Sequence, residues 1–160
     1  MTPLDTASPS GGATAGARPY RFREDVAIAD AAFEAWGATL EELFVAAAAA
    51  TTNTMAEHLE AIEDRQRRLI RLEEQSPDML LFRLLEELIF LKDAEGLLLR
   101  VPAVHIHRRD GALVLEAEAR GEPLDPRRHR LQVDVKAMTL HRLRVEQTES
   151  GWEASVVLDI

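Results

Sequence analysis

Cysteine is absent from this chain of 160 residues. Its absence excludes disulfide bonds, thiolate metal sites and a cysteine nucleophile, and it fits a reducing compartment such as the cytoplasm. Long apolar stretches are also missing, so we expect no membrane-spanning helix. With 46% hydrophobic and 29% charged residues, the composition is typical of a soluble globular protein.

Short catalytic motifs are missing as well. The sequence has no phosphate-binding glycine-rich loop, no Gly-x-Ser-x-Gly elbow, no His-Glu-x-x-His pair and no Cys/His metal pattern. His105 and His107 are two residues apart and could chelate a metal from one face of a strand, but we favour an exposed strand face. An enzyme that acts alone is not expected, because no nucleophile with its base can be assembled.

Residues 1–19 consist mainly of Thr, Ser, Gly, Ala and Pro, without the basic start and apolar centre of a signal peptide. We expect this leader to be disordered and solvated. Residues 20–160 are sufficient for a single domain, since domains commonly contain about 100–150 residues.

Acidic residues outnumber basic ones, 28 against 19, and the net charge is −9. This charge repels a phosphate backbone and favours cations or basic partner surfaces, so non-specific binding to nucleic acid is disfavoured. Basic clusters at residues 65–71 and 127–130 are more typical of solvated faces than of RNA contacts.

Two helices are predicted by their boundary residues. Thr39 and Glu42 form a capping-box pattern, which predicts a helix from Leu40 to about Met55. Ser76 with Pro77 predicts the start of a second, strongly apolar helix that Gly96 ends.

The remaining segments favour strands. A short strand and turn are expected from Ala27 to Gly37, and the segment Arg67–Glu73 fits either a helix tail or, as we favour, a half-buried strand. After Gly96, alternating apolar residues predict a hairpin around Asp110-Gly111, a loop at residues 121–130 and further strands from residue 131 to the end. We therefore predict an α+β fold in which two helices pack on a mainly antiparallel sheet in a single domain.

The last residues have two interpretations. Asp159 and the carboxylate of Ile160 place oxygen donors close together, an arrangement that suits a hard divalent cation. A frayed chain end explains the same residues, and on physical grounds alone it is the simpler interpretation.

Several segments resemble the archease family. Val135–His141, Gly151-Trp152 and Val156–Ile160 are similar to the family's C-terminal signature. Asp30–Phe44 resembles the family's opening strand and helix. Leu84–Leu97 resembles its second helix, and Gly121–His129 resembles its loop. The resemblance extends over about residues 20–160.

This resemblance implies an α+β accessory protein, not an enzyme, that promotes guanylylation and multiple turnover of an RtcB-type RNA ligase in tRNA splicing and RNA repair. RNA and GTP are involved indirectly, and no membrane is expected. The resemblance also implies a divalent cation, usually calcium, with magnesium or manganese as alternatives. Its ligands would be Asp30, Asp159 and the terminal carboxylate of Ile160, which the last strand should bring beside Asp30. Lys136 and His141 are secondary candidates for contacts with phosphate or the partner.

One departure from the family pattern concerns the residues before Asp30. The family usually has His-Thr-Ala-Asp, whereas this chain has Ala27-Ile28-Ala29-Asp30. The change removes an imidazole and a hydroxyl that could orient the carboxylate. Alternative functions are a stand-alone metal-dependent hydrolase or phosphotransferase, with Asp30 and Asp159 positioning the cation, or a general chaperone or interaction module.

Overall fold

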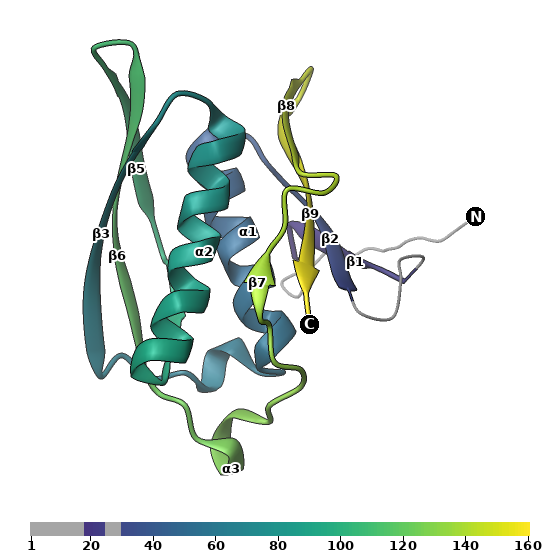
Figure 1. Cartoon of the computed structure of the whole chain (residues 1–160), viewed down its shortest axis with the longest axis vertical. Helices are drawn as coiled ribbons and strands as arrows, with labels where there is room; N and C mark the ends of the chain where they lie inside the picture. Colours follow the sequence, from purple (N-terminus) through teal and green to yellow (C-terminus); the bar gives the residue numbers. More distant parts are fainter. Residues whose placement is uncertain (1–17, 25–29) are drawn as a thin grey trace.

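The computed structural model describes residues 18–24 and 30–160. The disorder predicted for the leader therefore stays a prediction, because residues 1–17 lie outside the described residues, as do the family-departing residues Ala27 to Ala29. The described strands form a five-stranded and a four-stranded sheet (Figure 1). The five-stranded sheet contains β1 Tyr20–Arg23, β2 Asp30–Gly37, β7 Ala137–Met138, β8 Arg144–Thr148 and β9 Gly151–Asp159. The four-stranded sheet contains β3 Gln66–Glu74, β4 Leu97–Arg100, β5 Val104–Arg109 and β6 Ala112–Pro123.

Both long helices begin and end where their boundary residues predict. In α1 (Leu40–Met55), the Thr39 hydroxyl accepts from the Glu42 backbone N–H at 3.1 Å, and the Glu42 carboxylate accepts from Ala38 N–H at 2.9 Å. The Thr39 bond is the one that the capping-box pattern predicts, whereas the Glu42 carboxylate reaches the N–H one residue before the cap instead of that of Thr39. In α2 (Pro77–Glu95), the Ser76 hydroxyl accepts from Met79 N–H. The helix ends at Gly96, whose φ of 65° suits a residue without a Cβ atom.

All strand pairs in the two sheets are antiparallel. The β5–β6 hairpin turns through Asp110 and Gly111, both with positive φ, as a two-residue turn of the predicted type requires. The segment Arg67–Glu73 lies within β3, so the strand interpretation is confirmed. Gly121 in β6 permits a close approach of β4, since a Cβ atom there would lie 1.8 Å from the Leu98 carbonyl oxygen.

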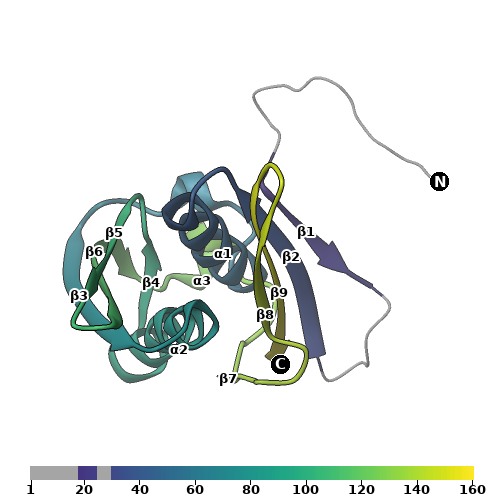
Figure 2. The ribbon, with the colours of Figure 1, turned by 90° about the horizontal axis from the view of Figure 1, so that it is seen from above.

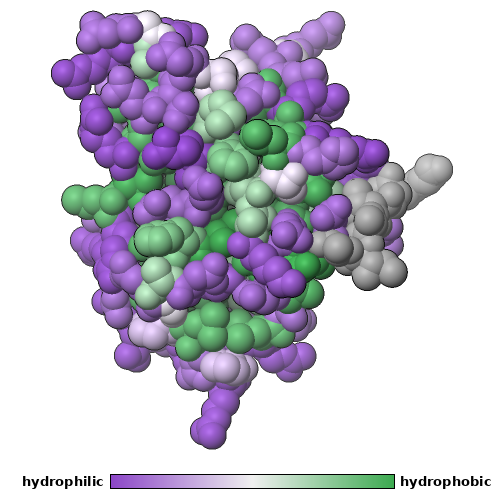
Figure 3. All heavy atoms as spheres, viewed as in Figure 1, coloured by the Kyte–Doolittle hydropathy of each residue, from purple (hydrophilic) through white to green (hydrophobic). Residues whose placement is uncertain are grey.

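The two helices lie between the two sheets (Figure 2). Helix α1 contacts strands of both sheets, and α2 packs mainly on β3 and β4 while also reaching β7. Phe33 from β2, Phe44 from α1 and Leu84 from α2 are almost fully buried in one shared core. Polar residues cover most of the face seen in Figure 3, with apolar patches showing through between them. The α+β class and the antiparallel pairing are confirmed, and the strands divide between two sheets that enclose the helices.

The segment between residues 124 and 143 differs from the prediction. A short helix, α3 (Pro126–His129), replaces part of the expected loop, and only the two residues of β7 form a strand before β8. Alternation from residue 131 predicted more strand, but Val135 and Met138, three residues apart, are the buried positions, whereas Leu131, Val133 and Leu140 are exposed. The segment crosses from one sheet to the other, so local packing on α2 and α1 determines which side chains are buried.

Candidate functional site

Asp30 and Asp159 lie directly opposite each other at the end of the five-stranded sheet. Asp30 is the first residue of β2, Asp159 is the last of β9, and the antiparallel register pairs them. Directly opposed residues of such a pair share one face of the sheet, with Cβ atoms about 4.5–5.5 Å apart. Within residues 18–24 and 30–160, neither carboxylate has an ion-pair partner. Two like charges are therefore held together without a counter-ion from these residues.

The residues around Asp159 are held in place on both sides. On one side, β9 pairs with β2, which carries Asp30. On the other side it pairs with β7, where Ala137 lies opposite Asp159 and the Lys136 backbone N–H donates to the Asp159 carbonyl at 2.8 Å. The Ile160 side chain is half-buried and packs against the core. The last strand thus continues through Asp159, and the backbone at this position is paired rather than frayed.

Of the two secondary candidates, only Lys136 lies next to the paired carboxylates. Its backbone contacts Asp159, and its side chain is exposed. His141 is also exposed, in the turn between β7 and β8, where its backbone N–H donates to the Thr139 hydroxyl at 2.8 Å. This turn joins Met138, which pairs with Leu158, to Arg144, which pairs with Ser155, so His141 lies farther along β9 from Asp159 than Lys136 does.

Lys92 of α2 fixes the segment that precedes Lys136, a role that the sequence reasoning missed. Its buried Nζ donates to the Val135 carbonyl at 2.8 Å and to Asp134 Oδ1 at 2.5 Å, and it lies 2.6 Å from Asp93 Oδ1. Burial lowers the pKa of Lys92, but its bonds to the Asp134 and Asp93 carboxylates raise the pKa by more than burial lowers it, so the net shift is upward. The sequence did indicate that Lys92 is buried, because position 92 lies on the same helical face as Leu81, Leu85 and Leu88.

A second polar cluster, the Glu122 cluster, comprises Glu122 of β6 with Arg128 and His129 of α3. Glu122 and His129 are buried, and Arg128 is partly exposed. Glu122 Oε2 accepts from the Glu63 backbone N–H at 2.7 Å and lies 2.9 Å from His129 Nε2, while Oε1 pairs with Arg128. His129 Nδ1 accepts from the Asp125 N–H at 2.8 Å, so the proton of the neutral ring is on Nε2 and is donated to Glu122.

The charge of Glu122 is stabilised in this cluster. Burial raises its pKa, but the bonds from Arg128, the Glu63 backbone and His129 outweigh burial and lower the pKa to about 2. The cluster joins the end of β6 to α3 and to the chain before β3. Because every side-chain polar atom of Glu122 and His129 has a partner, within the cluster or on the Glu63 and Asp125 backbone, we assign the cluster to the architecture of the loop rather than to chemistry.

The sheet end offers carboxylate oxygens but few side-chain ligands for a cation. Among the described residues, no three or more His, Cys, Asp or Glu side chains gather in a metal-binding arrangement. The predicted set has two side-chain carboxylates, from Asp30 and Asp159, and its third donor would be the carboxylate of Ile160. Oxygen donors of this kind suit a hard divalent cation, with the remaining positions left to water or to a partner. The residues therefore fit such a cation.

The other candidate residues are consistent with a structural role. His105 and His107 have ring centroids 5.3 Å apart on β5, but they belong to no three-residue ligand group in the part of the chain that the structure describes. Each arginine between residues 65 and 71 has a glutamate partner within ion-pair distance, in the pairs Arg65–Glu63, Arg67–Glu118, Arg68–Glu95 and Arg71–Glu116. This basic cluster is thus largely neutralised, as expected for a solvated face.

Known proteins are similar to this chain over most of its length. The model of the Archease protein family matches residues 20–160. A protein archease from Pyrococcus furiosus is 37% identical over 133 residues, which are 82% of this chain and 93% of that protein. The solution structure of Methanobacterium thermoautotrophicum protein 1598 superposes with a TM-score of 0.77 at 31% identity, covering 89% of this chain and 99% of the other.

A third protein shares the fold alone. The crystal structure of an archease from Thermotoga maritima, described as a possible chaperone, superposes with a TM-score of 0.53 at 20% identity and covers 88% of this chain and 98% of that one. Within the described residues of the present chain, no helix has the length and apolar character needed to cross a membrane.

Proposed function

This chain belongs to the archease family, and on that basis we propose that it is an accessory factor of an RtcB-type RNA ligase. It promotes formation of the ligase's enzyme-bound guanylate and allows the ligase to turn over more than once, in tRNA splicing and RNA repair. The joining chemistry belongs to the ligase, and this chain supplies no nucleophile or base.

The observation that carries the proposal is the pairing of Asp30 with Asp159 at the end of the five-stranded sheet. Directly opposed carboxylates repel each other, and a protein maintains such a pair at a cost in stability unless a cation offsets the repulsion. Calcium, magnesium and manganese all accept carboxylate oxygens. We therefore propose that Asp30, Asp159 and the Ile160 carboxylate hold one such cation. When bound, the cation would supply positive charge for a phosphate oxygen.

The chain's own residues would position this site. The β2–β9 register holds the two aspartates on one face, and the packing of Ile160 on the core limits the movement of its carboxylate. Lys92 holds Val135, and through it the neighbouring Lys136, against the same end of the sheet. The exposed Lys136 ammonium is then placed to contact a phosphate or an acidic residue of the partner.

The charge of the chain favours a protein partner over direct RNA binding. Its net charge of −9 repels a phosphate backbone, and the arginines of the basic cluster at residues 65–71 are paired with glutamates. An acidic accessory protein is instead steered toward a basic surface of the ligase. RNA and GTP would therefore meet this chain only through the ligase.

The test is an RNA-joining assay with the cognate RtcB-type ligase, GTP and a molar excess of RNA over ligase. Product and ligase-bound guanylate are followed with the parent chain, with Asp30→Asn and with Asp159→Asn. Glu153→Gln is the matched control, because Glu153 is an exposed acid on the same strand β9. We expect the parent and the control to raise product beyond one turnover per ligase, and the two aspartate variants to lose most of this gain.

Three other outcomes contradict the proposal. Equal product with and without the chain excludes an accessory role. Joining of RNA or hydrolysis of nucleotide by the chain alone favours a stand-alone metal-dependent enzyme. If the chain raises recovery of active ligase after heating but leaves its turnover unchanged, a chaperone role is favoured.

A further inference from the structure

Arg100 is an arginine without a counter-ion, placed opposite another arginine. It is the last residue of β4, and the β4–β6 register pairs it with Arg120. Like charges directly across a sheet destabilise the pair. Arg120 is neutralised, because its Nε donates to Glu118 at 2.9 Å and its guanidinium lies 3.6 Å from Asp64. Arg100 has no hydrogen-bond or ion-pair partner in the described part of the chain.

The Nε atom of Arg100 is also buried. It is one of only two buried side-chain polar atoms among the described residues that have no hydrogen-bond partner, the other being His107 Nδ1. Proteins pair almost all of their buried polar atoms, and a buried donor without an acceptor is costly. A bound molecule that supplies the acceptor would account for this one.

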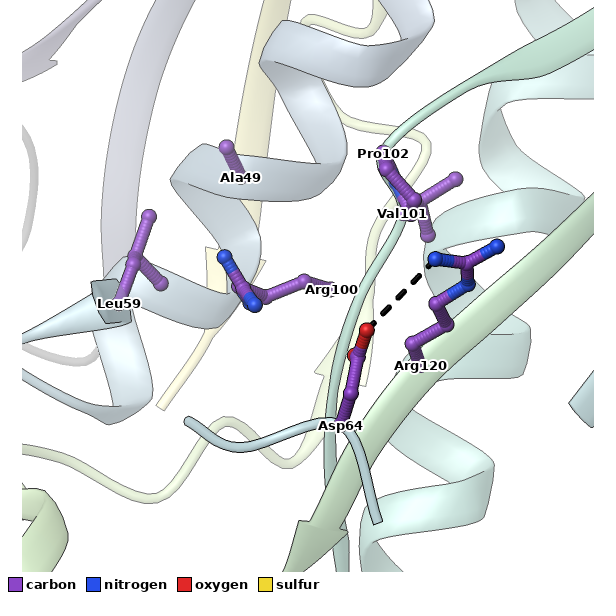
Figure 4. A pocket seen from close by; sticks show the side chains of 7 residues that line it. All are labelled: Ala49, Leu59, Asp64, Arg100, Val101, Pro102 and Arg120. Atoms are coloured by element: carbon purple, nitrogen blue, oxygen red, sulfur yellow. Dashed lines mark ion pairs between the residues drawn. The ribbon is translucent and has the colours of Figure 1, made fainter. Parts of the chain in front are cut away.

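A cavity of about 260 Å³ adjoins Arg100. Its remaining lining is Ala49 of α1, Leu59 of the 3-10 helix η2 (Leu59–Ala61), Val101, Pro102 and the Asp64–Arg120 ion pair. Figure 4 shows this ion pair on one side and the Arg100 guanidinium pointing away from it, toward Leu59. The cavity thus combines apolar walls with one cation that has no partner.

We propose that this cavity binds a small monocarboxylate with a short apolar chain, whose two oxygens accept from the Arg100 guanidinium. One uncompensated positive charge calls for a single negative charge, and a carboxylate matches the guanidinium fork. The aliphatic walls accept the apolar chain. The volume lies just below the range of about 300–1,000 Å³ usual for small-molecule sites, so the ligand must be small. The net charge of −9 disfavours polyanions such as nucleotides.

This site is separate from the paired carboxylates. Arg100 belongs to the four-stranded sheet, whereas Asp30 and Asp159 belong to the five-stranded sheet on the other side of the helices (Figure 2). The inference does not depend on the proposed cation or on the ligase. Its test therefore needs only this chain.

The experiment is a titration of the full ¹⁵N-labelled chain with sodium isobutyrate, followed through the arginine Nε–H resonances and through the backbone amides of residues 49 and 101, which line the cavity and still report on binding when Arg100 is replaced. Isobutyramide is the neutral control of the same shape, and inorganic phosphate tests the other common anion. The variants are Arg100→Gln, which removes the charge, and Ala49→Leu, which fills the cavity while keeping Arg100. Arg109→Gln is the matched control, because Arg109 is an exposed arginine at the tip of the β5–β6 hairpin.

We expect a saturable shift of the Arg100 Nε–H resonance with isobutyrate in the parent and in Arg109→Gln. Loss of a charge-assisted pair should weaken binding by about 10–100-fold in Arg100→Gln, and Ala49→Leu should abolish saturation. The proposal is overturned if no saturable shift occurs or if Ala49→Leu binds like the parent. It is also overturned if isobutyramide binds as well as isobutyrate, or if phosphate saturates the site at lower concentration. If Arg100→Gln does not fold, the binding measured with Ala49→Leu tests the proposal by itself.

Discussion

Protonation of Glu122 should destabilise the chain in a defined range of acid pH. The Glu122 carboxylate is buried and accepts bonds from Arg128, His129 and the Glu63 backbone, which together lower its pKa from 4.5 to about 2. A group whose pKa is depressed in the folded state stabilises that state above its unfolded pKa. This stabilisation is therefore complete above about pH 4.5 and is lost progressively as the pH falls toward about 2.

The magnitude follows from the same shift. A change in pKa from 4.5 to about 2 corresponds to about 3 kcal/mol in free energy of unfolding. The Arg128 side chain is 41% exposed, so solvent screens its contribution, and we expect about 1–2 kcal/mol. The assay is urea unfolding of the parent and of Glu122→Gln between pH 7 and pH 2.5.

Glu122→Gln should be less stable than the parent at pH 7, and the difference should shrink as the pH falls. Glu116→Gln is the matched control, because Glu116 is an exposed acid on the same strand β6, and its stability should follow that of the parent at every pH. If the parent and Glu122→Gln lose stability in parallel down to pH 2.5, the assigned role of the cluster is wrong.

Three further predictions concern the end of the five-stranded sheet and the segment that Lys92 holds beside it. Calcium, magnesium or manganese should raise the melting temperature of the parent, because a ligand that binds only the native state stabilises it. This shift in melting temperature should be lost in Asp30→Asn and in Asp159→Asn. Unchanged shifts in both variants would refute the site. Residues added after Ile160 should weaken the same shift although every side chain remains, and an undiminished shift would remove the terminal carboxylate from the ligand set. Lys92→Met should lower the free energy of unfolding by about 1–2 kcal/mol, because the Val135 carbonyl loses its buried donor. Hydrogen exchange should show the loss mainly in residues 131–138, and uniform deprotection would contradict a local anchoring role.

Local patterns in the sequence determined the elements whose causes are themselves local. The Thr39–Glu42 cap and the Ser76 cap with Gly96 bound the two long helices, since each boundary is a contact between residues a few positions apart. The two-residue turn at Asp110-Gly111 likewise determines the β5–β6 hairpin. The α+β class follows from the order of these elements along the chain.

The candidate site was predicted only by resemblance to a family. No local pattern connects Asp30 with Asp159, which lie near opposite ends of the described chain and meet only through the β2–β9 register. The sequence could not reveal that Glu122 and His129 are buried, because Glu is usually exposed and is buried only with partners, and His has no strong preference for either environment.

Tertiary packing alone decided how the strands are distributed and how the chain crosses between them. Two sheets enclose the helices because both faces of α1 are apolar and each needs a surface to cover it. Alternation from residue 131 predicted strand, yet Lys92 holds Asp134 and Val135 against α2, and the segment pairs for only two residues. A period of two indicates which residues can share a face, but a strand forms only where a neighbouring edge is available to accept its hydrogen bonds.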